Sequence, residues 1–219
     1  MEYLHKLIGF IRDPGPLIDW VGYPGLAVII FLETGALVFF LPGDSLLVTA
    51  GLYAAAGKLT PGGPMAVVYL NLLLIPMAVL GDAVSYLIGA RMGPALFKRP
   101  ESRYFKPQHL QRAHAFYEKH GGKAIIIARF MPVVRTFVPV VAGAAKMPYR
   151  RFAAFNVIGG ASWILSMTLI GFLLGQVVPN IGQHIEKVIV VVVLISLSPG
   201  IVEYVRGRLN ARKQAAGVK

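Results

Sequence analysis

The stretch ARFMPVVRTFVP, residues 128–139, carries two arginines around a proline inside an otherwise apolar segment. On one unbroken helix, Arg129 and Arg135 would point about 120° apart, because each residue turns an α-helix by roughly 100°. Pro132 lies between them and favours a break, since proline lacks the backbone N–H that a helix interior needs. The sequence therefore predicts a broken segment in which both guanidinium groups converge on one place.

The composition around this stretch is that of an integral membrane protein. Of 219 residues, 56% are hydrophobic and 15% are charged, and the mean hydropathy is +0.63, which is too apolar for an ordinary soluble domain. Lys and Arg outnumber Asp and Glu by 22 to 10, with the excess in a few polar segments. That distribution is typical of cytoplasmic loops that face anionic lipids, so we expect membrane phospholipids and no nucleic acid as partners. The chain has no Cys, which excludes thiol catalysis.

Two apolar runs are each divided by a proline. Residues 25–57 contain FFLPGDS, with Pro42 and Gly43 at the break, and residues 124–145 are divided at Pro132. No half of either run reaches the roughly 20 residues that a helix needs to cross the hydrocarbon core. Basic residues flank the second run on both sides, so both of its ends are expected in the cytoplasm. We predict two re-entrant helical hairpins that enter the membrane from opposite faces.

The rest of the chain divides into spans, a loop and termini by the same criteria. Segments 64–90, 152–175 and 188–205 are apolar and are predicted to be transmembrane helices, about three in all. The predicted polar elements are an interfacial helix over 1–24, a basic cytoplasmic loop with an amphipathic helix over 91–123, and a cytoplasmic tail over 206–219. The whole chain, 1–219, is thus one all-α membrane domain with a cytoplasmic C-terminus. Paired broken segments in two halves of a chain are typical of inverted-repeat transporters with a site near the bilayer midplane.

Five ionisable residues at membrane depth are the main candidates for a functional site: Glu33, Asp44, Asp82, Arg129 and Arg135. Each costs at least about 2.5 kcal/mol in the bilayer and persists when it is paired, hydrated or functional. Two acids facing two guanidinium groups would satisfy four of them. Ion pairs that merely hold the hairpins together are the alternative, but such pairs stabilise poorly compared with apolar packing. Broken backbone at depth is tolerated mainly around a cavity, and half-helix N-termini attract anions, which together favour an anion site.

Six residues are candidates for lining this site: Asp82, Pro42, Gly43, Pro132, Asn156 and Trp163. Asp82 fits local capping or packing equally well, and Asn156 and Trp163, which share a helix face, are interpreted first as packing residues. The histidines of the polar loop are not spaced as a helical metal pair, so we expect neither a metal nor another cofactor.

Two blocks resemble the signatures of the DedA family of bacterial membrane proteins, which share a domain with eukaryotic lipid scramblases. They are FLETGALVFFLPGDSLLVTAG, residues 31–51, and HGGKAIIIARFMPVVRTFVPVVAGAAKMPYRRFAAFNVIGGASW, residues 120–163. The resemblance covers residues 25–175. It implies that Glu33, Asp44, Arg129 and Arg135 are functionally important. It also implies that the protein returns polyprenyl phosphate carriers, notably undecaprenyl phosphate, across the cytoplasmic membrane in dependence on the proton gradient.

We therefore expect a flippase for a lipid phosphate in the bacterial inner membrane, and not an enzyme. Arg129 and Arg135 are predicted to bind the phosphate, because the guanidinium fork matches its oxygens. Glu33 and Asp44 are predicted to be counter-ions and proton carriers. The alternatives are a phospholipid scramblase or a proton-coupled small-ion transporter, and then a membrane lipid phosphatase or a structural scaffold. Expected partners are the lipid phosphate and protons. A homo-oligomer is a possible assembly.

Overall fold

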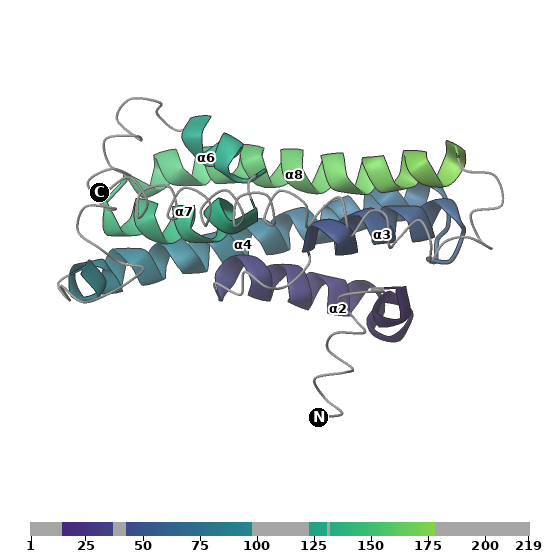
Figure 1. The fold of residues 1–219 in the computed structure, drawn as a ribbon, viewed down its shortest axis with the longest axis horizontal. Helices are drawn as coiled ribbons and strands as arrows, with labels where there is room; N and C mark the ends of the chain where they lie inside the picture. Colours follow the sequence, from purple (N-terminus) through teal and green to yellow (C-terminus); the bar gives the residue numbers. More distant parts are fainter. Residues whose placement is uncertain (1–14, 37–42, 98–122, 131, 178–219) are drawn as a thin grey trace, which may run out of the picture.

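The computed structural model describes residues 15–36, 43–97, 123–130 and 132–177, and within these ranges it contains helices and no strands (Figure 1). The helices, in chain order, are α2 (Gly15–Gly35), α3 (Gly43–Ala55), α4 (Pro64–Phe97), α6 (Lys123–Ala128), α7 (Pro132–Ala144) and α8 (Tyr149–Val177). The predicted all-α class is confirmed.

Two of the helices, α4 and α8, are long and apolar enough to cross a membrane, over Pro64–Met92 and Tyr149–Val177. Each stretch has 29 residues, or about 43 Å at 1.5 Å per residue, which exceeds the roughly 30 Å of a bilayer core. They correspond to two of the three predicted spans. The third, 188–205, lies outside the described residues, as do the predicted tail over 206–219 and most of the basic loop.

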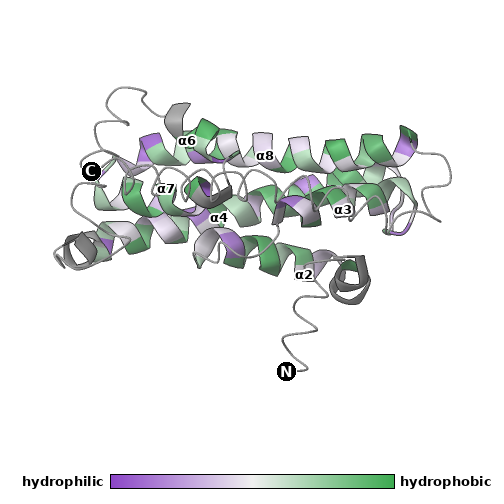
Figure 2. Cartoon of the chain, viewed as in Figure 1, coloured by the Kyte–Doolittle hydropathy of each residue, from purple (hydrophilic) through white to green (hydrophobic). Residues whose placement is uncertain are grey.

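The outer surface of these helices is apolar. Figure 2 shows that hydrophobic residues predominate along α2, α3, α4 and α8. On α8, for example, Leu165, Leu169 and Leu173 are each at least 41% exposed. An exposed leucine stripe along a helix of this length is suited to contact with lipid tails.

The four shorter helices form two pairs. The α2 and α3 pair occupies the right part of the view in Figure 1 and the α6 and α7 pair the left part, with their inner ends near the middle of α4 and α8. Each pair packs on both long helices: α2 on α4 and α3 on α8 in one pair, α6 on α8 and α7 on α4 in the other. The break that the sequence predicts from Pro132 corresponds to the boundary between α6, which ends at Ala128, and α7, which begins at Pro132.

Glycines bring the backbones of α3 and α8, and of α4 and α7, into direct contact. A Cβ atom added at Gly51 of α3 or Gly171 of α8 would lie 2.2 or 2.0 Å from backbone of the facing helix. The same distance is 2.0 Å at both Gly89 of α4 and Gly143 of α7. Such close approach needs residues without a side chain, and it is how membrane helices gain packing energy where lipid removes the hydrophobic driving force.

Helix α2 changes direction at Gly22, where φ is 55° and ψ is −156°. That backbone conformation is strained for residues with a side chain and suits glycine. The sequence predicts an interfacial helix over 1–24 followed by the first hairpin from residue 25. In the structure the change of direction lies close to that boundary, and residues 1–14 of the predicted interfacial helix lie outside the described residues.

Two apolar clusters flank the centre of the molecule. The larger one joins α2, α3, α4 and α8 and includes Leu47, Leu74 and Trp163. The smaller one lies around Tyr86 and Phe152, whose rings stack with centroids 4.6 Å apart. Between these two clusters lie the buried Asp82 of α4 and the buried Asn156 of α8.

Candidate functional site

Arg135, in the first turns of α7, joins three helices. Its Nη1 donates a hydrogen bond to Asp44 Oδ1 of α3 at 2.6 Å, and its Nη2 donates to Glu33 Oε1 of α2. The ends of the two helix pairs are therefore tied to each other by one guanidinium group.

Arg129, which follows α6 directly, makes a separate set of contacts. Its Nη1 donates to Asp82 Oδ2 of α4 at 2.5 Å and to Asn156 Oδ1 of α8 at 2.7 Å. The amide of Asn156 is held in turn, because its Nδ2 donates to the carbonyl oxygen of Val79 at 3.0 Å. Arg129 is thus fixed to the two long helices, whereas Arg135 is fixed to the other short pair.

Trp163 of α8 stands between the two arginines. Its indole Nε1 donates to Asp44 Oδ1 at 2.7 Å. The guanidinium carbon of Arg135 lies 4.5 Å from its ring centroid and that of Arg129 lies 5.7 Å away. Both distances are within the range of cation–π attraction, so one buried ring contacts both positive charges.

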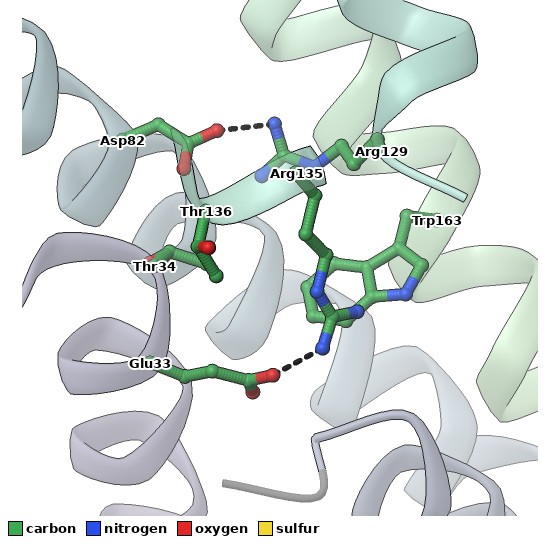
Figure 3. A pocket seen from close by; sticks show the side chains of 7 residues that line it. All are labelled: Glu33, Thr34, Asp82, Arg129, Arg135, Thr136 and Trp163. Atoms are coloured by element: carbon green, nitrogen blue, oxygen red, sulfur yellow. Dashed lines mark hydrogen bonds and ion pairs between the residues drawn. The ribbon is translucent and has the colours of Figure 1, made fainter. Parts of the chain in front are cut away.

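A cavity lies among these side chains, lined by Glu33, Thr34, Asp82, Arg129, Arg135, Thr136 and Trp163 (Figure 3). Glu33 and Asp82 are at opposite ends of the view, each joined to its arginine by a dashed line. Three buried polar atoms in this group have no hydrogen-bond partner among the described residues: Glu33 Oε2, Arg129 Nη2 and Arg135 Nε. Two of the three are N–H donors, which is the chemistry that an anion needs.

The charges of the cluster do not balance. Three carboxylates (Glu33, Asp44 and Asp82) meet two guanidinium groups, so the formal charge of these five side chains is 2 − 3 = −1 when all are ionised. An uncompensated charge is costly in a buried site. An anion that binds here must therefore arrive protonated, bind together with protonation of a carboxylate, or displace a carboxylate from its arginine.

Comparison with known proteins places this chain in a family. The model of the VTT domain matches residues 41–173, more than half of the chain. The chain is also 45% identical over 197 residues to Protein DedA of Escherichia coli (strain K12), a match that covers 90% of this chain and 87% of that protein. The chain belongs to the DedA family.

Other DedA relatives agree with this assignment. An uncharacterized membrane protein of Mycobacterium tuberculosis (strain ATCC 25618 / H37Rv) is 44% identical over 183 residues, which is 84% of this chain and 78% of that protein. The inner membrane protein YqjA of Escherichia coli (strain K12) is 40% identical over 152 residues, covering 69% of this chain and 66% of YqjA. No solved structure matches the chain. The DedA family assignment and the apolar helices together make this a membrane protein.

Local features explain how the DedA fold places Glu33. A Cβ atom added at Gly43, the first residue of α3, would lie 1.8 Å from Glu33 Oε2, so a side chain at this position would force the carboxylate to move. The end of α2 is held against α4 by Ser85, whose hydroxyl lies 2.8 Å from the carbonyl oxygen of Thr34 and 3.1 Å from that of Gly35. This contact satisfies carbonyl groups that a helix end leaves without partners.

The structure groups the predicted residues differently from the simplest expectation of two acids facing two arginines. Arg135 takes both Glu33 and Asp44, while Arg129 pairs with Asp82. Asn156 and Trp163, interpreted first as packing residues, are hydrogen-bonded to the charged groups. Gly43 lies against Glu33, Pro132 begins α7, and Pro42 falls outside the described residues.

Two threonines that line the cavity were not predicted from the sequence. Thr34 directs its hydroxyl to the Ile30 carbonyl oxygen of its own helix at 2.9 Å. Thr136 follows Arg135 directly and is 2% exposed. A threonine hydroxyl in an apolar helix can bond to its own helix, so the residue type alone does not indicate a site. The signal that could have identified Thr34 and Thr136 is that each directly follows a charged site residue, Glu33 or Arg135.

Proposed function

We propose that this DedA-family protein moves a lipid phosphate, specifically undecaprenyl phosphate, from the outer to the inner leaflet of the bacterial cytoplasmic membrane. The observation that supports this is the buried cluster, in which Arg129 Nη2 and Arg135 Nε remain without partners among the described residues. Guanidinium groups at membrane depth are costly, and unpaired N–H donors there fit an anion that visits the site.

The phosphate group binds between the two arginines in this proposal. Phosphate oxygens first accept hydrogen bonds from the unpaired Arg129 Nη2 and Arg135 Nε, and then displace the two carboxylates from Nη1 and Nη2 of Arg135. The ring of Trp163 closes the site on α8. The polyprenyl tail stays in the lipid beside the bundle while the head group crosses. Lysine would serve poorly at either position, because it is a point charge and not a planar fork.

Protons are coupled to this movement. When a phosphate engages the guanidinium of Arg135, Glu33 and Asp44 lose the partner that they share. A carboxylate that loses its cationic partner in a low-dielectric site takes up a proton. Phosphate binding and protonation then favour each other, and this linkage is reciprocal.

The proposal includes an architecture suited to such transport. We place α2 with α3, and α6 with α7, as two re-entrant hairpins that enter from opposite faces as inverted repeats, with the C-terminus in the cytoplasm. Helices α3 and α7 have 13 residues each, or about 20 Å, which is short of the roughly 30 Å core. The reciprocal packing of α3 on α8 and of α7 on α4 supports a related origin for the two halves.

A proton-coupled small-ion transporter is the second candidate function. The excess of three carboxylates over two guanidinium groups favours it, because a site with a formal charge of −1 attracts cations as well as protons. A phospholipid scramblase is a third candidate within the same chemistry. A flux assay in which lipid phosphate competes with the transported species separates these candidates.

The decisive experiment is reconstitution into liposomes with labelled undecaprenyl phosphate under imposed pH gradients. We expect accumulation of the label in one leaflet that depends on the gradient and disappears in an Arg129→Ala, Arg135→Ala double variant. Arg150→Ala is the matched control, since Arg150 is an exposed arginine at the start of α8. Equal transport by the double variant and the control would exclude the proposed phosphate site.

A further inference from the structure

We infer that Glu33 and Asp44 have different roles, and that Trp163 is the positioning residue that separates them. When phosphate engages Arg135, Glu33 takes up the proton, while the indole N–H of Trp163 keeps Asp44 ionised and in place. This inference rests on the proposed function and specifies which atom of the site receives the proton.

Asp44 has two side-chain donors on two different helices. Its Oδ1 accepts from Arg135 Nη1 of α7 at 2.6 Å and from Trp163 Nε1 of α8 at 2.7 Å. The indole ring is fully buried in the larger apolar cluster, so packing holds its N–H on Asp44 when Arg135 binds phosphate. Asp44 also lies in the first turn of α3, where the helix dipole favours a negative charge, and 18% of its side chain is exposed.

Glu33 has a single side-chain donor among the described residues. Its Oε1 accepts from Arg135, and its Oε2 makes no hydrogen bond of normal geometry in the described part of the chain. Besides Arg135, the backbone N–H of Gly43 is the hydrogen-bonding group that favours its negative charge. Its side chain is 1% exposed and is therefore shielded from bulk water. Loss of Arg135 therefore strands this carboxylate more completely than Asp44.

The charged groups around the two carboxylates point the same way. Glu33 of α2 faces Asp44 and the start of α3, Arg135 of α7, and beyond them Asp82 of α4 with Arg129. Asp82 and Asn156 hold Nη1 of Arg129, and the proposed phosphate takes its free Nη2, so Arg129 does not replace Arg135 as the partner of Glu33. Asp44 of α3 faces Glu33, Arg135 and Trp163.

The nearby acids therefore disfavour an ionised Glu33 once Arg135 turns away, because like charges in a buried site oppose each other. Asp44 meets the same like charge from Glu33, but it keeps the indole N–H as a donor. The proton that accompanies the phosphate is accordingly assigned to Glu33.

The test counts protons taken up when a lipid phosphate binds. The purified 219-residue chain is titrated with farnesyl phosphate in detergent micelles at about pH 7.5. Calorimetry in buffers of different ionisation enthalpy then gives the number of protons taken up per bound phosphate. The phosphate itself contributes the same proton uptake in every variant, so this contribution cancels when the proton counts of two variants are subtracted. We expect Glu33→Gln to take up about one proton fewer per bound phosphate than the unmutated protein. Asp44→Asn should take up the same number of protons as the unmutated protein.

Trp163→Phe keeps an aromatic ring beside the arginines and removes the N–H donor. We expect it to take up more protons than the unmutated protein, and the excess to disappear when Asp44→Asn is added. Tyr86→Phe is the matched control, because it removes a buried donor to the Met147 carbonyl outside the cluster and should leave the proton count unchanged. Gel filtration and thermal unfolding check that each variant is folded.

The outcomes separate this inference from the proposed function. If the unmutated protein binds no farnesyl phosphate, the proposed function fails and the inference fails with it. If it binds, but Asp44→Asn loses the proton and Glu33→Gln keeps it, or both lose it equally, only the division of roles is wrong. The comparison of those two variants stands even if Trp163→Phe does not fold. A proton count in folded Trp163→Phe equal to that of the unmutated protein removes Trp163 from the mechanism.

Discussion

Arg129 and Asp82 form a buried ion pair, with 2.5 Å between Nη1 and Oδ2 and side-chain exposures of 4% and 7%. The pair joins the residue after α6 to the middle of α4, and Asn156 of α8 completes it. Arg135 instead binds the acids of α2 and α3. Arg129 therefore binds the two long helices, whereas Arg135 links the two pairs of short helices.

Replacing Arg135 with Ala should reduce lipid-phosphate transport at least about tenfold, since a hydrogen bond to a charged group contributes roughly 1.5–3 kcal/mol. Arg135→Lys should restore only part of the activity, because ammonium cannot contact Asp44, Glu33 and phosphate as a fork does. Liposome transport of labelled undecaprenyl phosphate measures the effect. Full activity in Arg135→Lys would contradict the importance of the fork.

Replacing Arg129 with Ala should destabilise the protein as well as inactivate it, because it leaves Asp82 buried without its partner. In soluble proteins such a change costs about 3–5 kcal/mol. Adding Asp82→Asn to Arg129→Ala should recover most of the thermal stability and none of the transport. Thermal unfolding in detergent provides the comparison, and a double variant as unstable as the single one would show that the pair is not the cause.

Replacing Asn156 with Leu should weaken lipid-phosphate binding about threefold to tenfold, in line with one net hydrogen bond of roughly 0.5–1.5 kcal/mol. The variant removes an acceptor from Arg129 and leaves the Val79 carbonyl without the amide donor. Ser162→Ala is a control on the same helix, since the Ser162 hydroxyl bonds only the Ile158 carbonyl in the described contacts. Calorimetric affinities should fall for the first variant and not for the second.

Replacing Gly171 with Ala should destabilise the contact of α8 with α3 by about 1–3 kcal/mol, the usual range for overpacking. The added Cβ would lie 2.0 Å from the Val48 carbonyl oxygen, which belongs to rigid backbone. Gly62→Ala serves as the control, because its nearest neighbour would be 3.4 Å away. Equal thermal midpoints for the two variants would mean that the close approach is not needed.

Single cysteines at Lys123 and Lys146 should both be labelled from the cytoplasmic side only. The two positions flank α6 and α7, which form one hairpin in the proposed architecture. The absence of native Cys makes the experiment free of background. Labelling of one position from each side would mean that this segment crosses the membrane once and does not turn back.

The sequence by itself determined the class of the protein and the place where its helices break. Composition requires a membrane environment, since more than half of the residues are hydrophobic. Pro132 predicts the interruption between α6 and α7, because proline lacks a backbone N–H and is best tolerated at the first turn of a helix, where it lies in α7. The ionisable residues inside apolar runs identify the site for the same kind of reason: each is costly in its own surroundings, whatever it contacts.

Only the tertiary structure decided which of those residues meet. The partners of Arg129 and Arg135 lie 47, 91 and 102 residues away, and Trp163 reaches Asp44 across 119 residues. Local patterns place a side chain on a helix face, but they carry no information about which distant helix faces it. Asp82 and Trp163, already candidates in the sequence, thus found their partners through the packing of α4 and α8 with the short helices, which glycine contacts bring close together.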